Sequence, residues 1–454
     1  MANGHFLNDL LTTLTRRYAN RARSTQGEPG HRAAHLLDQC DQLLASDSEV
    51  SNLAQARDAL AVYDQFEDAE KKTFFQGLAE RYAPDPQAVT AACERYTATP
   101  DSATAQALHQ ASRSPRQELL RRLNTPPGHT FSLVRMRADL QRFARDEPEL
   151  DAVDADFMDL FRSWFNRGFL VMQRIDWNAP ANVLEKIIAY EAVHTIQSWA
   201  DLRRRVAPAD RRCFGFFHPA TGDEPLIFVQ VALTKGLPEQ VQTILRGEET
   251  DAHALENPDT ADTATFFSIS NCQSGLRGIS FGNFLIKQVV EELRQELPNL
   301  KHFVTLSPIP GFARWLDEQR QAEPRLLDEQ QQRAAELLQP QDGPDALIAH
   351  EKDVRQPLLR LAARYLVKEK NAAGLPVNPV SRFHLGNGAE VHRINWMADT
   401  SDNGLHQSHG LMVNYLYRLE DIERNHEGYA TGGKVAHSRE IQKLLRQSKT
   451  ATPV

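Results

Sequence analysis

Ser307 and His384 stand in the most unusual surroundings of any serine and histidine in this chain. Ser307 begins the segment Ser-Pro-Ile-Pro-Gly-Phe, directly after the apolar run at 303–306. Proline biases the residue before it toward extended geometry and has no N–H, so the chain must leave a sheet here. A serine at a strand end, in a rigid turn, is well placed to face a cleft. The same serine could instead cap the helix predicted at 312–316, and spacing alone favours the cap.

His384 precedes Leu-Gly-Asn-Gly, and Asn-Gly is a strong signal for a tight turn. An imidazole can exchange a proton near neutral pH, whereas a histidine in a turn can also simply face solvent. The sequence leaves both interpretations open. His406 and His409 have i,i+3 spacing, but Asp402-Asn403-Gly404 suggests a loop and no third ligand stands out, so no metal site is predicted.

A glycine-rich turn at 273–283 lies between a predicted strand, Thr265–Ile269, and a predicted helix. Apolar residues recur at every fourth position of this helix, at Phe281, Leu285, Val289, Leu293 and Leu297. A helix N-terminus presents unpaired N–H groups, and glycines let the backbone approach a ligand, so the turn could hold a pyrophosphate. A flexible entry into the helix is the alternative, and the pattern alone does not decide between them.

The elements before residue 168 are predicted to be helices almost throughout. Apolar residues recur there at three and four positions, and turns such as Pro126-Pro127-Gly128 separate the runs. The main runs are Leu7–Tyr18, Ala33–Leu44, Leu53–Phe66, Phe74–Tyr82, Leu119–Leu123 and Leu150–Phe165. This region has no recognisable catalytic spacing, and we interpret residues 1–167 as a helical domain for packing or assembly.

The pattern changes at Arg167-Gly168, and residues 168–454 are predicted to form one α+β domain. A helix is expected from Ala181 to about Val193, and further helices from about Leu326 to Lys368. The expected strands are Phe169–Met172, a hairpin of Cys213–Phe217 with Leu226–Leu233, Thr265–Ile269, Phe303–Leu306 and a resumption near Phe383 and Val391–Trp396.

Length and composition limit the class of protein. The 454 residues exceed what one hydrophobic core usually supports, and the net charge of -8 argues against a general nucleic-acid binder. Four cysteines lack CxxC spacing, so reduced thiols are expected. No apolar stretch is long enough to span a membrane, and neither a signal peptide at Met1–Arg17 nor a terminal Ser-Lys-Leu is present. A cytoplasmic location is therefore expected.

Several phrases of the second half together resemble the malonyl-CoA decarboxylase family, over essentially all of Phe169–Tyr417. The phrases are Tyr190-Glu191-Ala192-Val193-His194, Glu224-Pro225-Leu226, Phe267-Ser268-Ile269-Ser270, Leu306–Phe312, His384–Asp399 and Gly410–Tyr417. Together they are highly specific. The resemblance implies an α+β protein in which an N-terminal all-helical bundle precedes a GNAT-like mixed α/β catalytic domain.

The resemblance also implies site residues. The family's catalytic serine and histidine map onto Ser307 and His384, and Tyr417 corresponds to a supporting hydrogen-bond donor. The glycine-rich turn is similar to the acyl-CoA loop of the GNAT fold. Its implied binding residues are Arg277, Gly278, Ile279, Ser280, Phe281, Gly282 and Asn283. Ser280 departs from the pattern, because the loop usually has its first glycine there and some family members carry a glutamate.

The implied activity is that of a carboxy-lyase converting malonyl-CoA to acetyl-CoA and CO2, through a thioester enolate protonated by the Ser307/His384 pair. No metal or other cofactor is predicted, since CoA is part of the substrate and the thioester accepts the electrons. The resemblance implies a homo-oligomer, dimer or tetramer, formed partly through the helical domain. Its expected role is in fatty acid metabolism, and the sequence does not decide between regulation of malonyl-CoA for fatty-acid synthesis and breakdown of exogenous malonate. Two alternatives are an acyl-CoA N-acyltransferase, which would need an amine site and a base, and a non-catalytic acyl-CoA-binding regulator, which would be expected to lack Ser307 or His384.

Overall fold

The computed structural model describes residues 29–246, 257–279, 284–321, 327–338 and 344–447, and these form two compact units. The first unit contains the chain up to Val171 together with Phe217–Glu224 and Gln273–Phe281. The second contains Met172–Phe216, Pro225–Cys272 and the chain from Gly282 onward. The domain boundary expected between residues 167 and 168 stays a prediction.

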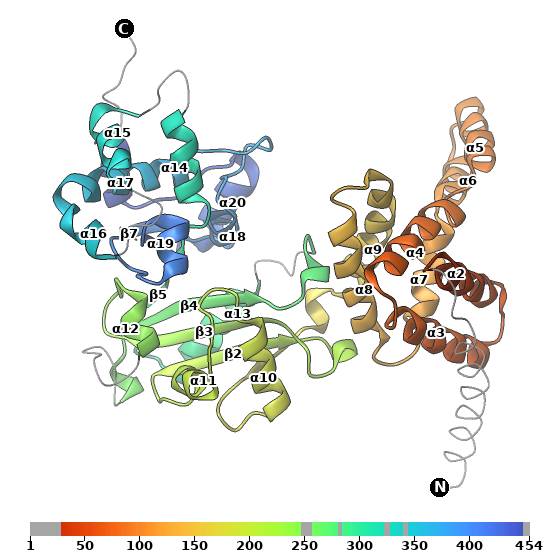
Figure 1. Cartoon of the computed structure of the whole chain (residues 1–454), viewed down its shortest axis with the longest axis horizontal. Coiled ribbons are helices and arrows are strands. Elements are labelled where there is room, and N and C mark those ends of the chain that lie inside the picture. Colours follow the sequence, from red (N-terminus) through yellow and green to blue (C-terminus); the bar gives the residue numbers. More distant parts are fainter. Residues whose placement is uncertain (1–28, 247–256, 280–283, 322–326, 339–343, 448–454) are drawn as a thin grey trace. The chain divides into compact units, whose positions relative to one another are not determined.

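Helices build the first unit, as Figure 1 shows for α2 to α9. They are α2 (Pro29–Ala45), α3 (Glu49–Tyr63), α4 (Asp68–Arg81), α5 (Pro86–Ala98), α6 (Ser102–Ser112), α7 (Pro115–Leu123), α8 (His129–Phe143) and α9 (Asp151–Trp164), with the 3-10 turns η1 (Pro148–Leu150), η2 (Arg167–Phe169), η3 (Pro219–Thr221) and η5 (Ser274–Leu276). The predicted helical region is confirmed for the described residues, while the run Leu7–Tyr18 lies outside them.

Helices α5 and α6 were not predicted because apolar periodicity could not reveal them. Helix α5 buries only Ala92 and α6 buries no side chain. Their starts are instead set by capping: Asp85 accepts a hydrogen bond from the N–H of Gln87, and Asp101 accepts one from that of Thr104. Helix α8 was also missed, although it buries Leu133 and several neighbours.

The second unit is a mixed sheet with helices, which confirms the predicted α+β class. Its elements are β1 (Val171–Arg174), α10 (Ala181–Tyr190), α11 (Trp199–Val206), β2 (Arg211–Phe217), β3 (Pro225–Thr234), α12 (Val241–Arg246), η4 (Pro258–Thr260), β4 (Thr263–Asn271), α13 (Phe284–Glu296), β5 (His302–Thr305), β6 (Ser307–Pro308), α14 (Phe312–Gln321), α15 (Glu329–Glu336), α16 (Pro344–Ala349), α17 (Glu351–Val367), α18 (Pro379–Gly386), β7 (Glu390–Asn395), α19 (Asp402–Ser408), β8 (Met412–Tyr417), α20 (Ile422–Gly432) and α21 (Arg439–Gln447). None of the described helices combines the length and apolarity needed to cross a membrane.

The sheet has the strand order β1-β2-β3-β4-β5-β8-β6, and β7 pairs with the other edge of β8. Strand β4 is antiparallel to β3 and parallel to β5, and β8 is antiparallel to β5, β6 and β7. Every residue of β2 and β3 is buried, and β4 is buried as well except toward its end. This sheet positions the residues that the sequence singled out.

One expected strand is wrong: the chain near Phe383 is helical, and the sheet resumes only at β7. The local signals explain why. Asn378 accepts a hydrogen bond from the N–H of Ser381, and Pro379 follows it at the first helical position, so the chain enters α18 here. Helix α10 ends at Tyr190, three residues before the expected Val193, so Glu191, Ala192 and Val193 are not helical.

Candidate functional site

Ser307 lies where two parallel strands separate. Strands β4 and β5 pair from Thr263 with His302 to Phe266 with Thr305, and the N–H of Leu306 donates to the carbonyl of Phe266 at 2.9 Å. Ser307 and Pro308 then continue as β6 along β8, in the same register as β5. Strand β4 runs on to Asn271 without pairing to β6, so an opening forms between them.

Ser307, His384 and Tyr417 are brought together by the fold. The Oγ of Ser307 lies 3.3 Å from Nε2 of His384, and the Tyr417 hydroxyl lies 2.8 Å from Nδ1 of the same ring. The Ser307 hydroxyl also donates to Oγ1 of Thr305 at 2.9 Å. Sequence reasoning missed Thr305, although its place two residues before Ser307 on one strand face was the available signal. The catalytic roles of these residues stay predictions.

Burial decides the charge of this group. Ser307, His384 and Tyr417 are all buried. Burial disfavours the charged imidazolium and lowers the pKa of His384 from 6.5 to about 3. Burial also raises the pKa of Tyr417 well above its ordinary value, so the phenol keeps its proton. One proton arrangement satisfies every bond: Tyr417 donates to Nδ1, Nε2–H donates to Ser307, and Ser307 donates to Thr305. The imidazole is then neutral and presents its N–H toward Ser307.

Helix α18 positions His384 in its last turn. Asn378, the cap of this helix, also donates from Nδ2 to the carbonyl of Pro310 at 3.1 Å, which ties the helix start to the Ser-Pro-Ile-Pro-Gly-Phe segment. The His384 ring stacks on Tyr415, with centroids 4.5 Å apart and an interplanar angle of 25°. The Tyr415 hydroxyl shares a 2.7 Å hydrogen bond with Oγ of Ser381. The start of α18 is therefore fixed to Pro310 and to Tyr415, and β8 contacts the imidazole directly through Tyr415 and Tyr417.

The tight turn predicted at Asn387-Gly388 is confirmed, and it ends α18 two residues beyond His384. Gly388 has φ +84°, and a Cβ there would lie 2.3 Å from the carbonyl oxygen of Ile422. Only glycine fits this position without moving the backbone. His384 itself is buried, so the solvent-facing alternative for this histidine is excluded.

A cavity of about 230 Å³ occupies the opening between β4 and β6. Ser307 and His384 line it together with Ser268 of β4, and most of the remaining wall is apolar, including Val193 and Pro308. A mostly apolar cavity with a few converging polar groups is the usual form of a small-molecule site.

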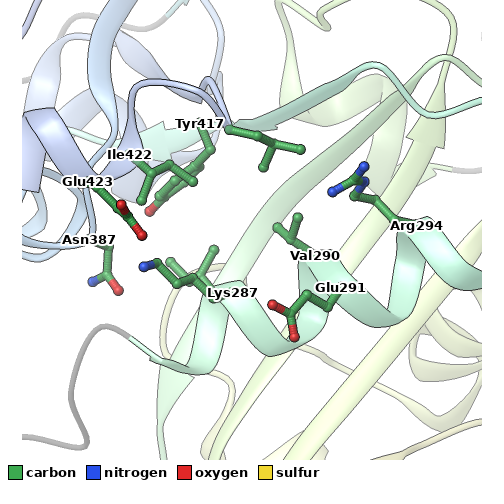
Figure 2. Close-up of a pocket in the computed structure, with 10 residues that line it drawn as sticks. Lys287, Val290, Glu291, Arg294, Asn387, Tyr417, Ile422 and Glu423 are labelled. Carbon is green, nitrogen blue, oxygen red and sulfur yellow. The ribbon is translucent and has the colours of Figure 1, made fainter.

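A second cavity of about 160 Å³ lies along α13 and reaches Tyr417 (Figure 2). Helix α13 contributes Lys287 and Arg294, and the facing wall contributes Glu423 of α20. Figure 2 shows the Lys287 ammonium directed toward Glu423 and Asn387. Tyr417 thus borders this cavity while its hydroxyl contacts the imidazole of His384.

The glycine-rich turn is described only in part. Arg277, Gly278 and Ile279 are described, and Gly278 has φ +82°, which glycine adopts readily. Ser280, Phe281, Gly282 and Asn283 lie outside the described residues. The turn follows β4 and precedes α13, as predicted, and the α13 face of Leu285, Val289 and Leu293 is buried.

Arg137 of α8 holds this turn within the first unit, and the sequence did not reveal it. Its side chain is 1% exposed and forms two hydrogen bonds, of 2.8 and 3.0 Å, with the Asp154 carboxylate. Its Nη1 also donates to the carbonyls of Gly275 at 2.7 Å and Arg277 at 3.0 Å. The backbone of the turn is therefore fixed by a buried guanidinium from the helical region.

Comparisons with protein families cover most of the chain. Residues 168–453 match the malonyl-CoA decarboxylase C-terminal domain, and residues 82–165 match the malonyl-CoA decarboxylase N-terminal domain. A protein of Anser anser anser named "Malonyl-CoA decarboxylase, mitochondrial" is 38% identical over 353 residues, which is 72% of this chain and 69% of that protein. The Mus musculus protein of the same name is 37% identical over 337 residues, covering 69% of this chain and 68% of that protein.

Solved structures agree with these matches. The crystal structure of malonyl-CoA decarboxylase from Rhodopseudomonas palustris has a TM-score of 0.85 and 48% identity, covering 90% of this chain and 99% of that one. The corresponding structure from Agrobacterium vitis has a TM-score of 0.84 and 50% identity, with the same coverage of 90% and 99%.

Proposed function

Because the chain belongs to the malonyl-CoA decarboxylase family, we propose that it converts malonyl-CoA to acetyl-CoA and CO2 as a carboxy-lyase. The observation that carries this proposal is the pair of Ser307 Oγ and His384 Nε2, 3.3 Å apart on the wall of a largely apolar cavity. The active site in this proposal is that cavity, with the malonyl group beside the pair.

The reaction breaks the bond between the carboxyl carbon and C2 of the malonyl group. The bonding electrons enter the thioester as an enolate, CO2 leaves, and one proton must then be added to C2. We propose that backbone N–H groups of β4 beyond Phe266, where pairing with β5 has ended, help to stabilise the thioester oxygen. One donor of this kind contributes about 2.7–4 kcal/mol to a transition state.

His384 is the proton donor in this proposal. The malonyl carboxylate brings a negative charge next to the buried imidazole and so favours its protonation when substrate binds. Once CO2 has left, the enolate carbon is the base that takes this proton, and the imidazole returns to the neutral form that burial favours. Positioned acid catalysis of this kind contributes about 10²–10⁴-fold.

Ser307 and Tyr417 support that proton transfer. We assign to Ser307 a hydrogen bond to the malonyl carboxylate or a relay of the proton, since it lines the cavity and its hydroxyl lies 3.3 Å from Nε2. Either role requires this hydroxyl to turn its proton from Thr305 toward the substrate. Tyr417 holds Nδ1 from the opposite side at 2.8 Å and so fixes the ring orientation. The acyl-CoA phosphates are assigned to the turn at Arg277–Asn283, whose described part is held by Arg137.

We further propose that no metal or additional cofactor takes part, that the protein is cytoplasmic, and that it acts in fatty acid metabolism as a homo-oligomer, dimer or tetramer. The helical region supports the oligomer, because α5 and α6 bury only one side chain between them and leave their surfaces available to another copy. Light scattering on the full chain measures the subunit number.

The deciding experiment follows acetyl-CoA formation from malonyl-CoA with a metal chelator present and no acceptor amine. Wild type should turn over, and His384→Ala should lose most of kcat, about 10²-fold or more, while CoA affinity is retained. The matched control is His406→Ala, because His406 is an exposed histidine on α19. An inactive wild type that still binds CoA would reject the decarboxylase and leave the N-acyltransferase or the regulator. A loss of CoA binding in His384→Ala would reject the assigned role.

A further inference from the structure

A buried carboxylate outside the proposed catalytic group lies behind the cavity wall. Glu191 follows α10 and is 8% exposed. Its two oxygens accept hydrogen bonds of 2.8 Å each from the hydroxyl of Ser268, and one of 3.0 Å from Nε2 of Gln230. The Ser270 hydroxyl adds a bond of 3.2 Å. The carboxylate is thus fixed to both β3 and β4.

The same carboxylate fixes the segment that follows it. Glu191 Oε1 accepts from the N–H groups of Val193 at 2.8 Å and His194 at 3.1 Å. The N–H of Ala192 donates to Oγ of Ser270 at 3.2 Å. Ala192 thus bonds to β4 directly, whereas Val193 and His194 are held to the Glu191 carboxylate, which is itself bonded to Ser268 and Ser270 of β4.

These bonds define one wall of the cavity. Val193 and Ser268 both line the cavity that contains Ser307 and His384. Because the Ser268 hydroxyl gives its proton to Glu191, it presents lone pairs to the cavity and has no proton to offer a carboxylate. The Glu191 carboxylate behind Ser268 also repels a second carboxylate, whereas His384 can become cationic. A malonyl carboxylate is therefore better accommodated beside His384, and the wall of Val193 and Ser268 is left for the carbon chain.

We propose that Val193 determines whether a substituent on C2 of the malonyl group is admitted, and that Glu191 is the positioning residue that holds Val193 and Ser268 in place. This inference rests on the proposed function, and it names the substrate feature that the site selects: an unbranched malonyl group over a 2-methylmalonyl group. One methyl group in an apolar pocket is worth about 10–200-fold in discrimination, so a single side chain is sufficient.

The test compares kcat/KM for methylmalonyl-CoA with kcat/KM for malonyl-CoA, in wild type, Val193→Ala, Val193→Ile and Glu191→Gln. Val193→Ala should raise the ratio of methylmalonyl-CoA to malonyl-CoA by about tenfold, and Val193→Ile should lower it. Glu191→Gln should also raise this ratio. The amide N–H₂ cannot accept the hydrogen bonds that the carboxylate oxygen accepts now, so Val193 and Ser268 are held less firmly. Val193 is only partly buried, so its variants should fold even if Glu191→Gln does not.

The matched control is Val354→Ala, which removes the same two methyl groups from a fully buried position in α17 away from the cavity lining. It should lower stability and leave the ratio unchanged. An unchanged ratio in both Val193 variants of an active enzyme would overturn this inference alone. A wild type that does not decarboxylate malonyl-CoA would instead overturn the proposed function on which the inference rests.

Discussion

The neutral imidazole of His384 is the residue whose behaviour depends most on its surroundings. Its Nδ1 accepts a hydrogen bond from Tyr417, its Nε2–H donates to Ser307, and the ring stacks on Tyr415, so water does not solvate it. Such an environment penalises the imidazolium and lowers the pKa of the ring to about 3. The proposed mechanism uses this property, since protonation then depends on the arrival of the substrate carboxylate.

A pH dependence of stability follows from this. The pKa of His384 is lower in the folded protein than in the unfolded chain, so between about pH 6.5 and 3 the unfolded chain binds a proton that the folded protein does not. The stabilising contribution is therefore complete above pH 6.5 and is lost as the pH falls. The free energy of unfolding should decrease by up to about 1.4 kcal/mol per pH unit from this group.

The measurement is the thermal midpoint of wild type and His384→Gln at pH 7, 6, 5 and 4. The midpoint of wild type should fall more steeply than that of the variant. Burial also lowers the pKa values of His129, His194 and His218, but these groups are common to both proteins and cancel in the difference. Parallel curves would mean that His384 titrates normally and is not shielded from water.

At the scale of the element, α18 is the helix whose direction sets the distance from His384 to Ser307. Its cap Asn378 is fully buried and bonds both to Ser381 within the helix and to Pro310 in the segment after β6. A rotation of α18 about this cap would move the buried imidazole of His384 away from Ser307. The helix cap is therefore also a positioning contact for the proposed active site.

Asn378→Ala should lower the free energy of unfolding by about 1–2 kcal/mol and should also reduce kcat. The loss of the helix cap explains the lower stability, and the loss of the hydrogen bond to Pro310 explains the lower kcat. Asp328→Ala is the matched control, because Asp328 caps α15 with a hydrogen bond from the N–H of Gln331. Its thermal midpoint should fall while kcat stays the same. Equal kcat losses in the two variants would show that the bond to Pro310 has no positioning role.

At the scale of the whole molecule, the helical region contributes more than packing. Arg137 and Gly275 are 138 residues apart, yet the guanidinium donates to the backbone of the glycine-rich turn and pairs with Asp154. The sequence of this region indicates packing or assembly only. An arginine among many arginines carries no local signal of such a contact, so only the fold could identify it.

Arg137→Met should lower the free energy of unfolding by about 3 kcal/mol, which is the lower end of the range for breaking a buried ion pair. The lower end is expected because the Asp154 carboxylate stays partly exposed to water. It should also weaken acetyl-CoA binding several-fold if the turn holds the phosphates. Calorimetric titration with acetyl-CoA and the thermal midpoint measure the two effects.

Arg116→Met provides the control. Arg116 forms an equivalent buried pair with Asp156 at 2.8 Å and donates to the carbonyls of Leu78 and Ala79, but it does not bond to the turn. It should lose stability and keep acetyl-CoA affinity. If both variants lose affinity equally, the turn does not depend on Arg137.

The sequence by itself determined the features that rest on local backbone chemistry. The helical first region, the α+β second region, the strand before Ser307 and the turn at Asn387-Gly388 all follow from periodicity, proline and glycine, and the structure confirms them. Periodicity does not predict the helical state of Phe383, because a short apolar run fits a strand or a helix; the cap at Asn378 decides for the helix.

Only the tertiary structure decided which residues meet. Ser307 and His384 are 77 residues apart and His384 and Tyr417 are 33 apart, so their contacts depend on how α18 and β6 both pack against β8. The same packing removes water from His384 and commits the proton of Ser268 to Glu191. Solvation and hydrogen-bond partners are properties of the folded neighbourhood, and residues distant in sequence supply that neighbourhood.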